Sequence, residues 1–338
     1  MIFVVVAFTL FALSLFFTFL VRQFSLKKNI VDVPNQRSSH ALPTPRGGGL
    51  VFVFLFYTVV FILYFTHFIQ LKIFMSLLGG VPIAVIGYCD DVLSVNALWR
   101  ATIHLLSAIW SIAWLHGVSF LNFNGHIFYA PVLCSILAVF ITVWFVNLYN
   151  FMDGIDGLAG MEAVFVSFVA GCILISHGFY AISFICFALT FSVLGFLFFN
   201  WPPAKIFMGD VGSGFLGFIF ADLMWITNNY HQLSFPFWWI LLSVFIGDAS
   251  YTLIYRMIQK KNWKQAHREH AYQRLTQAGV THKHMTLSIF VINLLICLPA
   301  VDIYSHLHND ILMILYFVTI ASIFWLAWFF ITRQYNIG

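Results

Sequence analysis

Charged residues are scarce in this chain of 338 residues. Only 8% of the residues are Asp, Glu, Lys or Arg, whereas 62% are hydrophobic and the mean hydropathy is +0.93. A water-soluble fold of this length would expose far more charge. The composition therefore excludes an ordinary soluble globular protein and indicates a chain whose main solvent is lipid.

Other features are absent as well. The five cysteines have none of the paired spacings of a metal site, so packing is their expected role. No basic segment precedes the first apolar run, and Arg22, Lys27 and Lys28 follow it, which is the wrong charge order for a cleaved signal peptide. No repeat, low-complexity tract or linker divides the sequence. We therefore expect one membrane domain over residues 1–338.

Long apolar runs, in contrast, recur along nearly the whole chain. A hydrocarbon core about 30 Å thick needs roughly 20 apolar residues per helix, so the sequence predicts an all-α polytopic membrane protein with about eleven transmembrane helices. The predicted spans are Ile2–Leu20, Leu50–Phe68, Phe74–Tyr88, Ala101–His116, Ala130–Val146, Met161–His177, Ala181–Phe199, Gly212–Ile226, Phe235–Tyr255, Thr286–Tyr304 and Ile311–Ile331.

The basic residues predict an orientation, because Lys and Arg near span ends are held on the cytoplasmic side. With the N-terminus outside and the C-terminus in the cytoplasm, every Lys and Arg except Lys72 falls on the cytoplasmic side. The formal net charge of +4 is then a signal of topology and not of nucleic-acid binding. The long polar loops also lie on that side, so we expect the active site there.

Most of the acidic residues gather at the same predicted face. Asp90 and Asp91 follow the third span, Asp153 and Asp156 follow the fifth, and Asp210 follows the seventh. A carboxylate at the bilayer centre costs about 2.5–3.5 kcal/mol, so acids near helix ends call for a function. Mg²⁺ takes oxygen ligands, usually one or two carboxylates together with substrate phosphates. The pattern predicts a metal and phosphate site, which Asp248 could join from the ninth span.

Glycine-rich stretches accompany these acids. The stretch from Asp153 to Gly157 has glycines that permit a turn and the close approach of a ligand. Stretches at 43–49 and 208–214 place free backbone N–H groups before helices, where anions are favoured, but neither is a Walker or dinucleotide fingerprint. Taken singly, each motif has a bland alternative: a solvated loop for Asp90 and Asp91, and a helix cap for Asp153–Gly157.

Together and in this order, the motifs resemble those of the polyprenyl-phosphate N-acetylhexosamine-1-phosphate transferases. The resemblance covers nearly the whole chain. It rests on Asp32–Gly49, Asp90–Asp91, Asn147–Gly157, Gly209–Gly214 and the histidine-bearing segment His267–His270.

The resemblance implies transfer of an N-acetylaminosugar 1-phosphate from a UDP-sugar to undecaprenyl phosphate, with release of UMP. It also implies Mg²⁺ as cofactor, with Mn²⁺ as an alternative, and a multi-pass location in the bacterial inner membrane. The expected partners are the two substrates and the lipid bilayer, without nucleic acid. The sequence leaves open whether the protein is a monomer or a homodimer.

The resemblance also assigns roles to individual residues. Asp210 is expected to be the leading metal ligand, with Asp156 beside it. The expected catalytic acids are Asp90, Asp91, Asp153 and Asp156, and one of the first two is a base or second ligand next to the lipid phosphate. The expected contacts to nucleotide and diphosphate are Arg37, Thr44, Arg46, Asn147 and Asn150.

A cytoplasmic loop at residues 257–285 is expected to recognise the sugar. Related N-acetylglucosamine-1-phosphate transferases carry a His-x-His-His pattern here, whereas this chain reads His270-Ala271-Tyr272-Gln273. The difference resembles the branch that initiates O-antigen chains, in which some members accept 6-deoxy sugars such as N-acetylfucosamine or N-acetylquinovosamine. The candidate contacts in this loop are Arg268, His270, Gln273 and Arg274.

A multi-helix transporter or lipid flippase is the competing interpretation. Such a protein should place its polar residues near the midplane on broken helices and show paired repeats. Here the carboxylates gather at one face, and the sequence shows no repeat, so we favour the enzyme.

Overall fold

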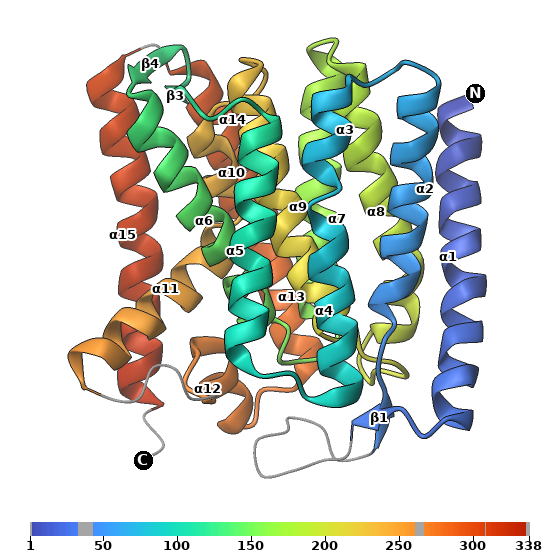
Figure 1. Ribbon diagram of the computed structural model, residues 1–338. Helices are drawn as coiled ribbons and strands as arrows, with labels where there is room; N and C mark the ends of the chain where they lie inside the picture. Colours follow the sequence, from blue (N-terminus) through green and yellow to red (C-terminus); the bar gives the residue numbers. More distant parts are fainter. Residues whose placement is uncertain (1, 33–42, 261–266, 308, 336–338) are drawn as a thin grey trace.

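The computed structural model describes residues 2–32, 43–260, 267–307 and 309–335. Within these ranges it is a bundle of helices that run between two ends of the molecule (Figure 1). The first eight helices are α1 (Ile2–Lys27), α2 (Gly49–Phe65), α3 (Leu71–Leu77), α4 (Gly80–Leu93), α5 (Ala97–Trp114), α6 (Pro131–Met152), α7 (Leu158–Ser176) and α8 (Tyr180–Asn200). The remaining elements of this kind are α9 (Asp210–Asn229), α10 (Phe235–Leu241), α11 (Ser243–Ile258), α12 (Ala271–Gln277), α13 (His282–Ile292), the π-helix η1 (Asn293–Cys297), α14 (Leu298–His306) and α15 (Asp310–Gln334).

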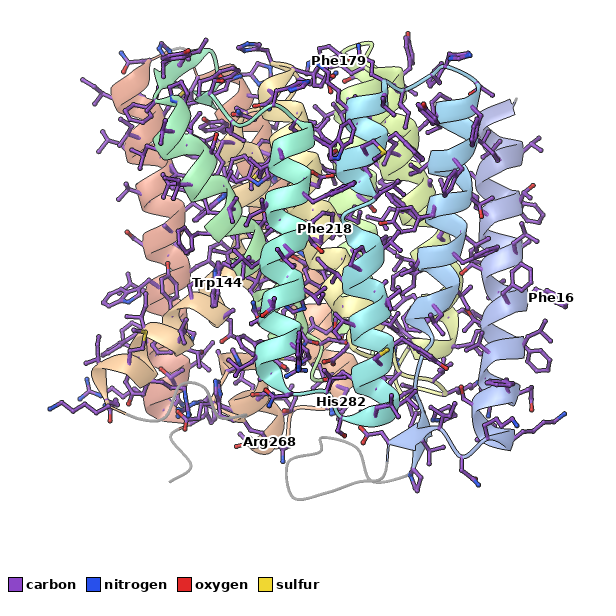
Figure 2. All side chains as sticks on the ribbon, in the orientation of Figure 1. Phe16, Trp144, Phe179, Phe218, Arg268 and His282 are labelled. Carbon is purple, nitrogen blue, oxygen red and sulfur yellow. The ribbon has the colours of Figure 1, made fainter. Side chains whose placement is uncertain are left out.

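Helix α9 forms the centre of the bundle. Every residue from Val211 to Asn228 is buried, and α4 and α6 pack along it. The outer helices expose large apolar side chains, such as Phe16, which points away from the bundle (Figure 2). Buried apolar positions all round one helix and an apolar outer surface are expected of a bundle dissolved in lipid.

The structure supports a polytopic membrane protein. Among the described residues, 8 helices are long and apolar enough to cross a membrane, or up to 9 if one bent pair forms a single span. The predicted spans Leu50–Phe68 and Ala101–His116 also correspond to helices, α2 and α5. The predicted count of about eleven crossings and the orientation remain predictions.

Two predicted spans are not single straight helices. The span predicted at Phe74–Tyr88 is divided into α3 and α4 at a break around Gly79. The span predicted at Phe235–Tyr255 is a pair, α10 and α11, bent by 81°. Figure 1 shows α11 running obliquely toward α15 at the end of the bundle near the C-terminus. Hydropathy reports only the length of an apolar run, so it could not predict either break.

Two short antiparallel hairpins add to the helices. Strands β1 (Val31–Asp32) and β2 (Thr44–Pro45) pair at one end of the bundle, and β3 (Phe120–Phe123) and β4 (His126–Tyr129) pair at the other. The predicted all-α class is therefore correct for the bundle but omits these strands. Helix α1 begins at one end of the bundle, and α15, the last described helix, finishes at the other (Figure 1).

Candidate active site

Two helix ends bring acidic side chains together. Asp90 and Asp91 lie in the last turn of α4, and Asp210 is the first residue of α9. The carboxylate of Asp91 accepts hydrogen bonds from the backbone N–H groups of Asp210, at 3.1 Å, and of Val211, at 3.3 Å. The first free N–H groups of α9 therefore bind a carboxylate, which the helix dipole also favours.

This contact requires a glycine at position 209. Gly209 has φ +77°, and a Cβ atom there would lie 2.3 Å from Oδ2 of Asp91. Only a residue without a side chain allows the carboxylate to approach this backbone turn.

Replacing Gly209 by Ala should displace Asp91 and lower both stability and activity. Backbone strain and the clash together should cost about 1–3 kcal/mol in the free energy of unfolding, measurable by thermal unfolding in detergent. Gly125→Ala is the matched control, because Gly125 has φ +97° but nothing within 4 Å of the added Cβ. If Gly209→Ala retained full activity, the Asp91 contact would not matter for the site.

Arg100, whose charge in the sequence indicates only a side of the membrane, joins two of the acids. From the first turn of α5 its Nη1 contacts Oδ2 of Asp90 and lies 2.9 Å from Oδ2 of Asp210. The side chains of Arg100 and Asp210 are 31% and 32% exposed, so solvent screens this pair in part. A cation thus already lies between the carboxylates of α4 and α9.

Helix α6 contributes amides to the same site. Asn150 Nδ2 lies 3.4 Å from Oδ2 of Asp210, and Asn150 Oδ1 accepts from Ser213 Oγ at 2.7 Å. Asn147, one turn earlier, donates to the carbonyl of Val143 at 2.7 Å. The structure therefore places Asn150 against Asp210, while Asn147 hydrogen-bonds within its own helix.

The loop after α6 carries Asp153 and Asp156. Asp153 caps α6, and burial raises the pKa of its carboxyl group well above the usual value, with Asp210, Asp91 and Asp156 adding to the effect. The carboxylate of Asp156 accepts from the N–H of Ala204 at 3.0 Å.

Two further side chains fix this loop and were missed from the sequence. His282 Nδ1 lies 3.4 Å from Oδ2 of Asp156, and Asn200 Oδ1 accepts from the N–H of Gly157 at 3.1 Å. Neither residue belongs to a recognisable motif, and each lies far from the loop in sequence. No pattern in the chain signals these contacts.

The carboxylates fit part of a Mg²⁺ ligand set, the rest of which substrate oxygens would supply. No three His, Cys, Asp or Glu side chains among the described residues form a cluster that could hold a metal by themselves. Asp91 and Asp210 are nevertheless adjacent through the Asp210 N–H, and both are partly buried beside other acids. Mg²⁺ usually takes one or two carboxylates and completes its shell with water and phosphate, so this donor set fits.

The predicted diphosphate contacts lie in and next to β2. Thr44 is buried within the strand. Arg46 Nη2 lies 2.7 Å from Oδ2 of Asp32. Burial alone would lower the pKa of Arg46, but Asp32, and more weakly Asp91 and Asp210, raise it above its ordinary value. Arg46 thus lies within the field of the acidic site, whereas Arg37 lies outside the described residues.

The loop predicted to recognise the sugar packs on the turn that carries Asp153. The hydroxyl of Tyr272, in α12, donates to the carbonyl of Phe151 at 2.8 Å. A Cβ atom at Gly154 would lie 2.1 Å from that hydroxyl and 3.1 Å from Nε2 of Gln273. Tyr272 and Gln273 therefore lie against the Asp153–Gly154 backbone.

Asp248 anchors this loop and is not placed with the other acids. Its carboxylate accepts from the N–H groups of Ala271, at 2.8 Å, and Tyr272, at 3.1 Å, and lies 3.5 Å from His270 Nδ1. His270 is buried and its ring stacks on His267 at 5.0 Å. Burial, then the neighbouring His270 and Arg256, lower the pKa of His267 to about 4, so this imidazole is neutral near pH 7.

Arg274 and Arg268, the two arginines of the loop, differ in burial. Arg274 is buried and donates to the backbone carbonyls of Glu269, at 2.9 Å, and Thr332, at 3.1 Å. These contacts attach the loop to α15. Arg268 is half-buried and lies at the same end of the bundle as His282 (Figure 2).

A cavity of about 400 Å³ opens beside Asp210. Arg100 and Asn150, which both contact Asp210, form its polar end together with that carboxylate. The polar side chains of His104 and Asn147 also line it. Its other walls are mainly apolar and come from α4, α5, α6 and α11, with Ile86, Ala101, Trp144, Phe151 and Leu253 among them. The cavity therefore suits a molecule with an anionic head and an apolar tail.

The sequence of this chain is similar to those of known proteins. A family model described as glycosyl transferase family 4 matches residues 73–228. The chain is 31% identical over 312 residues to the probable undecaprenyl-phosphate N-acetylglucosaminyl 1-phosphate transferase of Bacillus subtilis (strain 168), covering 90% of this chain and 86% of the relative. The chain belongs to glycosyl transferase family 4, the polyprenyl-phosphate N-acetylhexosamine-1-phosphate transferases.

Other members of glycosyl transferase family 4 are similar over different lengths. The undecaprenyl-phosphate alpha-N-acetylglucosaminyl 1-phosphate transferase of Escherichia coli (strain K12) is 27% identical, with 92% of this chain and 86% of the relative covered. The phospho-N-acetylmuramoyl-pentapeptide-transferase of Streptococcus pneumoniae (strain Taiwan19F-14) is 34% identical over 56% of this chain and 60% of the relative. The resemblance expected from the motifs is confirmed, and membership of a transferase family favours an enzyme over a transporter or flippase.

Proposed function

We propose that this protein transfers an N-acetylaminosugar 1-phosphate from a UDP-sugar to undecaprenyl phosphate and releases UMP. The observation that carries the proposal is the junction of Asp90, Asp210 and Arg100 at the polar end of the cavity. The acids and Arg100 suit a reaction between two phosphates. The apolar walls of the adjoining cavity suit a phosphate that bears a lipid chain.

The reaction joins the two phosphates directly. An oxygen of the lipid phosphate attacks the sugar-bearing phosphorus of the donor, and the bond between that phosphorus and the bridging oxygen of UMP breaks. The products are UMP and a lipid diphosphate sugar, so no covalent protein intermediate is required. Such transfers depend chiefly on positioning and electrostatic stabilisation.

Each described residue would contribute one part of this task. Arg100 would screen the phosphates at the polar end of the cavity, and Arg46 would bind the donor diphosphate. Asp90 or Asp91 would accept the proton of an acceptor phosphate that arrives protonated. Asn150 would orient Asp210 through the contact described above. Mg²⁺, held by Asp210 with Asp91 or Asp156, would neutralise the charge that develops on the transferred group.

The acceptor would enter from the bilayer through the apolar part of the cavity. Trp144 and Leu253 line that part, and α11, which carries Leu253, leans away from the bundle axis (Figure 1). With an outer N-terminus and about eleven crossings, the site and the C-terminus would face the cytosol of a bacterium. There the product would start an envelope glycan such as O-antigen.

The decisive experiment measures UMP release by the purified protein with undecaprenyl phosphate and Mg²⁺. UDP-N-acetylglucosamine should be tested beside its 6-deoxy relatives. Release that requires lipid, metal and one donor would support the proposal and name the sugar. No release with any donor, from protein that remains folded, would reject it.

The loop at Tyr272 and Gln273 should select the donor. A double change of both residues to His should shift the ratio of kcat/KM for 6-deoxy and 6-hydroxy donors by about 10-fold or more, because a hydrogen-bonding site rejects a donor lacking its partner group. The measurement compares UMP release with paired donors. As a control, Gln277→His changes α12 at an exposed position. An unchanged ratio in the double variant would remove the loop from donor selection.

Activity should need less Mg²⁺ as the pH rises. The pKa of Asp153 is raised by burial and by three neighbouring carboxylates, so this group holds a proton at low pH and loses it at higher pH. A cation binds the deprotonated cluster better, so the Mg²⁺ concentration for half-maximal rate should fall several-fold, roughly, as the pH rises and the cluster loses its proton. Titrations at constant ionic strength test this, and a requirement that rises with pH would contradict it.

A further inference from the structure

Glu162 is a buried acid that the proposed reaction does not use. It lies in α7 and is 1% exposed. Its Oε2 accepts a hydrogen bond of 2.6 Å from Nδ2 of Asn293, which is itself fully buried. The other polar atom of each side chain, Oε1 of Glu162 and Oδ1 of Asn293, is also buried and has no hydrogen-bond partner in the described part of the chain.

A proton on Glu162 would satisfy both oxygens at once. An ionised carboxylate inside a membrane bundle costs several kcal/mol or more, roughly, unless a cation pairs with it. Among the described residues, Glu162 is hydrogen-bonded to Asn293 and not to a Lys, Arg or His. A protonated Oε1 can donate to Oδ1 of Asn293 while Nδ2 of Asn293 donates to Oε2, which closes a cyclic pair of hydrogen bonds.

We infer that Glu162 is uncharged in the folded protein and forms a cyclic acid–amide pair with Asn293 that positions Asp156. The inference rests on the proposed function for the importance of Asp156, but not for the pair itself. Glu162 is thus a positioning residue that acts through the backbone.

Asn293 lies where the backbone departs from regular α-helix. It is the first residue of η1, the π-helical turn between α13 and α14. Pro299, near the start of α14, has no N–H to donate to a carbonyl one turn earlier. A widened turn accommodates this loss, and such π-turns occur frequently at functional sites.

The same two helices hold Asp156 from both sides. Helix α7 begins at Leu158, directly after the Asp156–Gly157 turn. Helix α13 begins at His282, which contacts Asp156, and its Thr286 Oγ1 donates to the carbonyl of Asp156 at 3.0 Å. Deeper in the bundle, the pair of Glu162 and Asn293 joins α7 to the continuation of α13. Loss of the pair would let α13 move and take two contacts away from Asp156.

Infrared spectroscopy tests the protonation state directly. The difference spectrum between wild type and Glu162→Gln at pH 7 should show one lost C=O stretch of a protonated carboxylic acid. A lost carboxylate band instead would overturn the inference. Gln retains the shape and the donor of the protonated acid, so this variant should also keep the pair.

Hydrogen exchange in the full-length protein tests the positioning role. In Glu162→Leu, the amide of Asp156, which donates to His282 Nδ1, should exchange at least about five-fold faster, whereas Glu162→Gln should match wild type. Asp222→Leu is the control, because Asp222 is another buried acid, bonded to Ser111 between α9 and α5. It should lower thermal stability without changing exchange at Asp156.

The rate of UMP release provides an independent test of the positioning role. Glu162→Leu should lower kcat about 10-fold or more and raise the Mg²⁺ requirement, and Glu162→Gln should restore both. Exchange at Asp156 that is unchanged in Glu162→Leu, or equal disruption in Glu162→Gln, would overturn the inference. If wild type itself releases no UMP, the proposed function fails, while the infrared and exchange results still decide whether the pair exists.

Discussion

Replacing Asp210 by Asn should lower UMP release at least about 1,000-fold, because a Lewis-acid metal supplies several kcal/mol of stabilisation and each 1.4 kcal/mol is tenfold in rate. Asn has the same shape but no charge. It leaves Arg100, which lies 2.9 Å from Oδ2 of Asp210, with a weaker partner. Initial rates over a range of Mg²⁺ concentrations provide the measurement.

The control for this change lies in the same helix. Asp222→Asn also removes a carboxylate from α9, but Asp222 is buried deep in the bundle and bonded to Ser111. It should leave UMP release within a few-fold, roughly, of wild type, as expected for a change outside the reacting groups. If Asp210→Asn kept full activity and its folded yield, Asp210 would not belong to the site.

Replacing Arg100 by Met should produce two effects of opposite sign. The rate should fall about 100-fold, because a positioned cation is lost where phosphate charge must be stabilised. The Mg²⁺ concentration for half-maximal rate should also fall, because Arg100 contacts both Asp90 and Asp210 and therefore competes with a metal for the same oxygens. Rate measurements at several Mg²⁺ and donor concentrations separate the two effects.

Lys205→Met is the matched control for Arg100. Lys205 is exposed, and its backbone carbonyl accepts from Arg22, so the change removes one positive charge without touching the acids. Its effect on both quantities should be small and should vanish at high salt. An Arg100 variant that needed more Mg²⁺, not less, would show that Arg100 helps to hold the metal and does not compete with it.

The sequence alone predicts the membrane class, the family and the gathering of Asp90, Asp91, Asp153 and Asp210. These properties depend on apolar run length and on the order of short motifs, both of which are local. Asp91 was correctly grouped with Asp210, although the reason, a carboxylate bound by the first N–H groups of α9, needs three-dimensional structure.

Contacts between distant segments could not be predicted. Arg100 reaches Asp210 across 110 positions of sequence, and His282 reaches Asp156 across 126. Charge and hydropathy patterns assign such residues to a side of the membrane but not to a partner. The same limit explains Arg274, whose charge suggested a phosphate contact but whose guanidinium bonds the carbonyl of Thr332.

Under the proposed function, the bend between α10 and α11 places one short helix, α11, beside both substrates. Leu253 of α11 lines the cavity proposed for the lipid, and Asp248, little more than one turn earlier, holds the backbone of Ala271 and Tyr272. Under the proposed function, a tilt of α11 that widened the lipid entrance would also shift the loop expected to contact the sugar, because both are attached to the same helix. Binding of the acceptor would then alter the affinity for the donor, and the reverse.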